Sequence, residues 1–184
     1  KLTLWLPSQG PAPLARQIAE ALNMNDGDLQ VLTGHVGGGF GYKIFLHPEQ
    51  LCVAWAARKI GKVVRWQQER SEAFLSDVHG RDNRTKAWAA VDETGKILAM
   101  EVSVHANMGA WLSNFGIYVP TFSAMRTLTG PYDIQIVGMR VRGIVTNTPA
   151  VDAFRGAGRP ETNYCLERLI DLSLIHISEP TRRS

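Results

Sequence analysis

The feature that most constrains this chain is the stretch GHVGGGFGYK, residues 34–43, which holds five glycines and a single phenylalanine. It directly follows residues 28–33, DLQVLT, a run that predicts a short strand. Glycines after a strand let backbone N–H groups approach an anion or a flat cofactor, because no Cβ stands in the way. The stretch therefore predicts a binding loop. A glycine-rich surface turn without a ligand is the competing interpretation, and it leaves Phe40 unexplained.

Two well-known nucleotide-binding motifs do not fit the spacing of these glycines. A P-loop requires Gly-Lys-Ser/Thr, whereas Lys43 follows Tyr42 and precedes Ile44. A dinucleotide-binding G-x-G-x-x-G motif that begins at Gly37 and Gly39 would need its third glycine where Tyr42 stands. Both motifs are disfavoured. A phosphate- or nucleotide-binding module with neither motif stays open as an alternative function.

The composition is typical of a globular chain, with 45% apolar and 20% charged residues among 184. The formal net charge of +3 includes no long run of like charges, which argues against a nucleic-acid partner. No apolar run approaches the roughly 18 residues that a membrane-spanning helix needs, so we expect no membrane partner. Cys52 and Cys165 lie far apart in helical patterns, which predicts two buried thiols and no protein-ligated metal.

The order of periodic segments predicts an α+β fold in which mixed sheets pack with helices. No repeat or linker is visible, so we expect a single region without an internal boundary. Strands are expected at 3–6, 28–33, 62–68 and 133–147, together with a hairpin over 84–111 that turns at DETG, residues 92–95. Helices are expected at 13–23, 47–61, 71–77 and 159–172.

Two further segments change the interpretation of the glycine loop. PSQGP, residues 7–11, places Gln9 in a short loop before the first expected helix. AFRG, residues 153–156, places Arg155 between an aromatic residue and a glycine, just before a helix start. In this order the three motifs resemble those of the molybdenum-binding large subunit of the xanthine dehydrogenase, aldehyde oxidase and aerobic carbon monoxide dehydrogenase family. The resemblance covers residues 3–171, and three motifs in order are more specific than any one of them.

The resemblance implies a molybdopterin cofactor, in dinucleotide form, whose dithiolene sulfurs hold molybdenum so that the protein supplies no metal ligand. It implies that Gln9 donates an amide hydrogen bond to the oxo group on the metal. It also implies that Gly38, Gly39, Phe40 and Gly41 pass their backbone along the cofactor, with Phe40 excluding water. Drier surroundings strengthen each hydrogen bond to the metal oxygens.

The same resemblance implies that Arg155 faces the substrate and stabilises negative charge on its oxygen, with Gly156 beside it in the cofactor-binding segment. Gly156 stands where carbon monoxide-oxidising members have cysteine, and Ile44 stands where purine-oxidising members have glutamate. Both substrates are therefore disfavoured, and an aldehyde or an N-heterocycle is expected. No glutamate in this chain matches the family's general base. For Lys43, a contact with cofactor phosphate and a plain surface position are both open.

The resemblance further implies partner subunits that carry iron-sulfur clusters and FAD, and a cytoplasmic location, with export of the folded complex as the alternative. The chain has no initiating methionine, and LSLIHISEPTRRS, residues 172–184, resembles the translation of a sequencing adapter. We therefore expect residues 1–171 to be part of a molybdopterin-binding region, residues 172–184 to be non-native, and this chain alone to be inactive. An interaction scaffold with a solvated glycine turn is the third candidate function.

Overall fold

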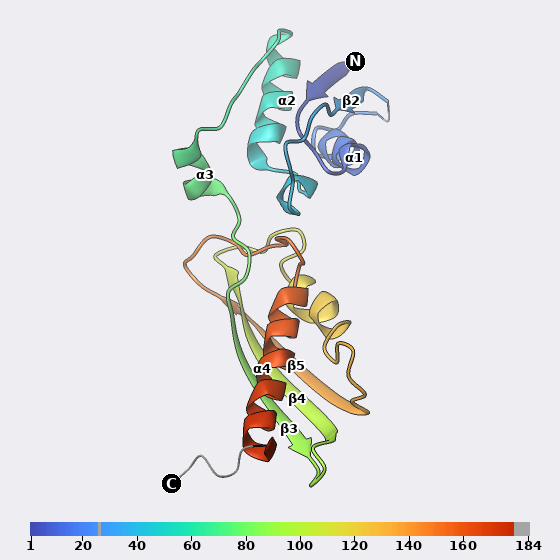
Figure 1. The fold of residues 1–184 in the computed structure, drawn as a ribbon. Helices are drawn as coiled ribbons and strands as arrows, with labels where there is room; N and C mark the ends of the chain where they lie inside the picture. The colour runs from blue at the N-terminus through green and yellow to red at the C-terminus, as the bar shows by residue number, and fades with distance from the viewer. Residues whose placement is uncertain (26, 179–184) are drawn as a thin grey trace. The chain divides into compact units, whose positions relative to one another are not determined.

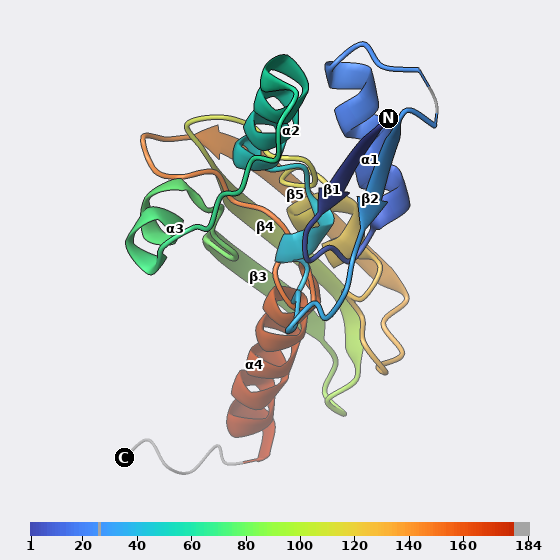
Figure 2. The ribbon, with the colours of Figure 1, turned by 90° about the horizontal axis from the view of Figure 1, so that it is seen from above.

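The computed structural model describes residues 1–25 and 27–178, and side chains are described as far as residue 173. The chain divides into two compact units, an N-terminal unit of Lys1–Ser76 and a C-terminal unit that begins at Asp77. Each unit combines helices with a β-sheet (Figures 1 and 2). The expected α+β class with mixed sheets is confirmed.

The N-terminal unit is built on two parallel strands, β1 (Leu2–Trp5) and β2 (Leu29–Leu32). Parallel strands need a crossover connection, and α1 (Pro11–Ala21) supplies it. The remaining helices of this unit are α2 (Pro48–Ile60) and α3 (Arg70–Ser76). The core between sheet and helices consists of buried aliphatic side chains from these elements: Leu4, Leu14, Ile18, Ala19, Leu29 and Ala54.

Sequence signals set the ends of α2, whereas the strand expected at 62–68 is wrong. Pro48 occupies the first turn of α2, and Gly61 ends the helix in the left-handed conformation, at φ 66°. Residues 62–68 have strand-forming composition but form no strand, and Val63 is 99% exposed. A strand is stabilised by a neighbour to pair with, and among the described residues none pairs with this segment.

The C-terminal unit contains a three-stranded sheet in the order β3–β4–β5. Strands β3 (Asn83–Val91) and β4 (Ile97–Gly109) form the expected antiparallel hairpin, and β5 (Ile136–Val145) pairs with β4 in parallel. The parallel pairing was not predicted. It requires the long crossover 110–135, which contains the π-helical turn η2 (Val119–Ser123).

Helix α4 (Arg159–Ser178) covers one face of this sheet and continues beyond the predicted end at residue 172 (Figure 1). Alternate residues of β4 face the helix because side chains along a strand point to opposite faces. Buried side chains of the strand, the crossover and the helix form the core: Met100, Val102, Val104, Ala106, Met108, Leu128, Ile134 and Leu166. This core fixes where α4 begins, and therefore where the segment before it lies.

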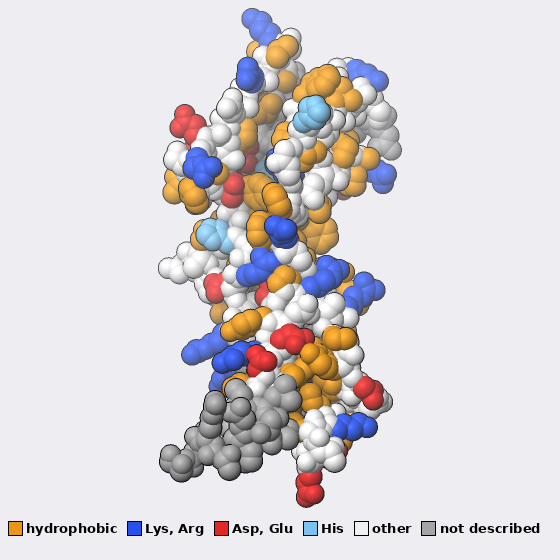
Figure 3. All heavy atoms as spheres, in the orientation of Figure 1, with side chains coloured by type: hydrophobic (Ala, Val, Ile, Leu, Met, Phe, Trp, Pro, Cys, Tyr) orange, Lys and Arg blue, Asp and Glu red, His pale blue; other side chains and the backbone are white. Residues whose placement is uncertain are grey.

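Many large apolar side chains remain on the surface of both units, as Figure 3 shows in orange. All five tryptophans of the chain are among them: Trp5, Trp55, Trp66, Trp88 and Trp111. Tryptophan is among the more buried residues on average, so the exposure of all five is unusual.

The two cysteines are free, and they differ in exposure. Cys165 on α4 is half-buried, and burial raises the pKa of its thiol. The expectation of a buried thiol is wrong for Cys52, because α2 presents this position to solvent. In the described part of the chain, no helix is both long enough and apolar enough to cross a membrane.

Candidate functional site

The glycine stretch leaves β2 and runs without regular structure into the short 3₁₀ turn η1 (Tyr42–Ile44). Gly37, Gly38 and Gly41 have φ of 68°, 87° and 96°, values that only glycine adopts without strain. Phe40 also has a positive φ, 52°, and its side chain is 54% exposed. A non-glycine residue in this conformation is uncommon, and such positions cluster at binding sites.

Gln9 is joined to this loop by both its backbone and its side chain. The backbone N–H of Gln9 donates a hydrogen bond of 2.9 Å to the carbonyl of Lys43. The N–H of Gly41 donates one of 3.0 Å to Oε1 of Gln9. The Gln9 side chain also packs so closely on Gly39 that a Cβ there would overlap its Cγ, Cδ and Oε1 atoms. The Gln9 side chain can therefore occupy this position only because residue 39 is a glycine.

These contacts decide which way the Gln9 amide faces. A backbone N–H can only donate, so the atom opposite Gly41 must be the carbonyl oxygen, and Nε2 is directed away from it. Neither Nε2 of Gln9 nor the N–H groups of Gly37, Gly38 and Gly39 have a hydrogen-bond partner among the described residues. The loop therefore presents several donors and little side-chain bulk, an arrangement that suits a ligand rich in oxygen or other acceptor atoms.

The ends of the loop are held together by Lys43 and Ser8. The Lys43 ammonium donates a hydrogen bond of 2.5 Å to the carbonyl of Val36. Ser8, which is only 3% exposed, donates from Oγ to the Lys43 carbonyl at 3.3 Å and accepts from the N–H of Gly10 at 3.0 Å. The Lys43 side chain therefore links the end of the loop to its beginning. This structural role is neither the phosphate contact nor the plain surface position that the sequence left open.

The segment that carries Arg155 lies in the C-terminal unit, immediately before α4. Gly156, Ala157 and Gly158 all have positive φ, at 100°, 45° and 93°. Gly158 packs so tightly that a Cβ would overlap the carbonyl oxygen of Val119. The Arg155 side chain is exposed.

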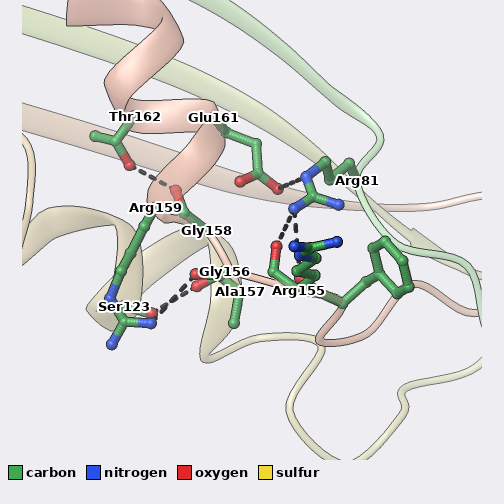
Figure 4. Close-up of polar contacts among 10 residues, drawn as sticks. Arg81, Ser123, Arg155, Gly156, Ala157, Gly158, Arg159, Glu161 and Thr162 are labelled. Carbon is green, nitrogen blue, oxygen red and sulfur yellow. Dashed lines mark hydrogen bonds and ion pairs between the residues drawn. The ribbon is translucent and has the colours of Figure 1, made fainter. Parts of the chain in front are cut away.

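Every carbonyl from residue 154 to residue 158 accepts a hydrogen bond (Figure 4). The donors in chain order are Ala157 N at 2.9 Å, the Arg81 guanidinium, Arg159 N at 3.2 Å, Ser123 Oγ at 2.6 Å and Thr162 Oγ1 at 2.6 Å. Just upstream, Asp152 is 1% exposed and accepts a 3.0 Å hydrogen bond from the N–H of Phe115. A backbone with this many partners holds one conformation, so the base of the Arg155 side chain is fixed.

The sequence did not point to Arg81, Ser123 or Asp152, which hold this segment. Arg81 and Ser123 are remote in sequence from Arg155, and only the packing of the C-terminal unit brings them beside its segment. Asp152 is close in sequence to Arg155, but its partner Phe115 is remote. Gly80, beside Arg81, carries a weak signal: a Cβ there would overlap the Phe154 side chain.

The predicted site residues fall into two sets. Gln9, Gly38, Gly39, Phe40 and Gly41 lie together in the N-terminal unit. Arg155 and Gly156 lie in the fixed segment of the C-terminal unit. Among the residues that the structure describes, no group of three or more His, Cys, Asp or Glu side chains could hold a metal ion directly.

The sequence of this chain matches a family model and several known proteins. The model of the molybdopterin cofactor-binding domain matches residues 1–174. The gamma subunit of the 6-hydroxypseudooxynicotine dehydrogenase complex of Paenarthrobacter nicotinovorans is 32% identical over 162 residues, which cover 88% of this chain and 20% of that protein. The carbon monoxide dehydrogenase large chain of Hydrogenophaga pseudoflava is 28% identical over 173 residues, which cover 93% of this chain and 22% of that protein.

The fold of this chain also matches those of solved structures. Quinoline 2-oxidoreductase from Pseudomonas putida matches with a TM-score of 0.89 and 29% identity, over 96% of this chain and 22% of that one. The aldehyde oxidoreductase from Desulfovibrio desulfuricans matches with a TM-score of 0.86 and 26% identity, over 96% of this chain and 19% of that one. The chain spans about a fifth of the length of these relatives.

Proposed function

Because this chain belongs to the molybdopterin cofactor-binding domain family, we propose that it is part of the catalytic subunit of a molybdenum hydroxylase. The observation that carries the proposal is the contact between Gln9 and the glycine loop, which leaves an amide donor beside a bare backbone. Three separate features fit a flat cofactor bearing oxygen atoms: the collision that a Cβ at Gly39 would cause, the left-handed glycines and the unpartnered N–H groups. A phosphate- or nucleotide-binding module is not favoured.

When bound, the cofactor supplies the redox and oxygen-transfer chemistry, while the protein supplies binding, orientation and electrostatics. Gln9 would hold the oxygen-bearing face of the cofactor with its Nε2 donor, whose direction the Gly41 N–H fixes through Oε1. Gly38, Gly39 and Gly41 allow the backbone to approach. Phe40, with its exposed ring, would exclude water from the bound cofactor.

Arg155 would stabilise negative charge that develops on a substrate oxygen, with five N–H donors in a rigid fork. Gly156 next to it carries no thiolate for soft Cu(I), and Ile44 carries no carboxylate for a purine. An aldehyde or an N-heterocycle is therefore the proposed substrate class. Two proteins with similar structures, an aldehyde oxidoreductase and a quinoline 2-oxidoreductase, support this proposal.

We propose iron-sulfur and flavin subunits as partners, in the cytoplasm. One relative is named as a subunit of a dehydrogenase complex, and the exposed tryptophans give this chain apolar surface for such contacts. Residues 1–171 are proposed as the native part of a molybdopterin-binding region and 172–184 as the non-native tail. Of that tail, residues 179–184 lie outside the described part of the chain.

The test uses the complete reading frame recovered from the source DNA and expressed with molybdate. We expect the purified protein to contain molybdenum and to release a pterin on denaturation, and Gln9→Ala to reduce the molybdenum content. Gln17→Ala, at an exposed position on α1, is the matched control and should leave it unchanged. A protein that contains neither molybdenum nor pterin, or that purifies with a nucleotide alone, would refute the proposed function.

A further inference from the structure

Arg81 lies in the irregular connection between α3 and β3, and it makes contacts of three kinds with the Arg155 segment and α4 (Figure 4). Its Nη2 donates to the carbonyl of Arg155 and, at 3.5 Å, to the carbonyl of Phe154. Its guanidinium lies over the Phe154 ring, with Cζ 5.3 Å from the ring centroid. Its Nε lies 3.6 Å from Oε1 of Glu161 in the first turn of α4.

The backbone around Arg81 is shaped to allow these contacts. Arg81 itself has a φ of 54°, an uncommon conformation for a residue with a side chain. The segment is tied to the chain upstream of Arg155 by a hydrogen bond of 2.9 Å from His79 N to Ala150 O and one of 2.8 Å from Asp152 N to His79 O. Gly80 then lets the chain pass against Phe154, where no Cβ would fit. The hydrogen bonds of His79 and the close packing of Gly80 on Phe154 therefore fix the backbone that leads into Arg81.

Glu161 supplies the second anchor for the guanidinium. Its side chain is 17% exposed, and its Oε2 is buried with no hydrogen-bond partner among the described residues. A buried carboxylate is costly unless a cation pairs with it, and Arg81 is the ion-pair partner that the structure gives it. The planar fork of Arg81 thus connects α4 to the carbonyls of residues 154 and 155.

We propose that Arg81 is a positioning residue, which fixes the backbone of Arg155 and so sets the direction in which the Arg155 guanidinium is presented to substrate. The inference rests on the role proposed for Arg155. Lysine could not replace Arg81, because a single ammonium cannot reach Glu161 and both carbonyls in the geometry of a planar fork. Arg81 acts through the Arg155 carbonyl and does not need to touch the substrate.

The test combines steady-state kinetics with hydrogen–deuterium exchange on the full-length holoenzyme, and exchange alone on the cofactor-free protein. Arg81→Met should lower kcat/KM by about 10- to 100-fold, the range that a displacement of about 1 Å in a positioning group produces. It should also speed amide exchange in residues 153–158, with or without cofactor. Arg84→Met is the matched control at an exposed position on β3, and it should change neither quantity.

A double variant separates positioning from an independent role. In an Arg155→Met background, Arg81→Met should produce no further loss of kcat/KM but should still speed exchange in residues 153–158. A further loss of tenfold or more would overturn the proposal, and so would unchanged exchange. Arg81→Lys provides the same comparison if the methionine variant does not fold. If Arg155→Met alone leaves turnover unchanged, the role proposed for Arg155 fails, while the exchange data still test the link between Arg81 and residues 153–158.

Discussion

The most direct test of the N-terminal site is Gly39→Ala, because the structure shows what a methyl group would meet. The new Cβ would overlap Cγ, Cδ and Oε1 of Gln9, while the backbone at position 39 is outside the positive-φ region and needs no change. The Gln9 side chain must therefore turn away and lose its bond from the Gly41 N–H. With Gln9 turned away, its Nε2 no longer donates to the cofactor, and a buried polar group left without its partner costs about 1–3 kcal/mol.

The lost donor predicts a loss of about 1–3 kcal/mol in cofactor binding, or roughly 5- to 150-fold in affinity. The assay is the molybdenum and pterin content of the full-length protein after dialysis, with circular dichroism to confirm the fold. Gly34→Ala is the matched control, because a Cβ at position 34 meets nothing within 4 Å and its φ is likewise not positive. We expect the control to retain the cofactor and Gly39→Ala to lose it.

A second comparison shows whether Gln9 is the cause. In a Gln9→Ala background the collision is relieved, so adding Gly39→Ala should cost much less than it does alone. The reasoning is refuted if Gly39→Ala and Gly34→Ala retain equal amounts of cofactor, or if the costs of Gln9→Ala and Gly39→Ala simply add.

Three further predictions concern other positions. Arg155→Lys in the full-length enzyme should lower kcat because a planar fork becomes a point charge, and equal turnover would remove Arg155 from the mechanism. Iodoacetamide at about pH 8 should modify exposed Cys52 before Cys165, because burial raises the pKa of the Cys165 thiol; mass spectrometry of the native chain that found Cys165 modified first would contradict this. The pKa of Asp92 is lowered from 3.8 by hydrogen bonds from the Thr94 hydroxyl and the Lys96 N–H, so its contribution to stability is present above that value and is lost as pH falls through the lowered pKa. Asp92→Asn should therefore destabilise the chain to urea at about pH 6, and the difference from the parent chain should shrink as the pH falls below 3.8; a difference that does not shrink would contradict this.

Local signals in the sequence were sufficient for most elements and for the candidate loops. The hairpin turn at residues 92–95 and the limits of α2 follow from short-range chemistry, a left-handed glycine in each case and Pro48 at the helix start. The strand expected at residues 62–68 is wrong because it depends on long-range pairing: strand-forming residues need a partner strand, which local composition does not supply.

The sequence by itself identified the family and the candidate groups: an amide, a bare glycine backbone and a guanidinium, in the order of that family's motifs, because these depend on residue types at short spacing. Only the tertiary structure decided how those groups are held. The orientation of the Gln9 amide depends on Gly41, 32 residues away, and the support of the Arg155 carbonyl depends on Arg81, 74 residues away. Such contacts depend on how each unit packs, and no local pattern in the chain records them.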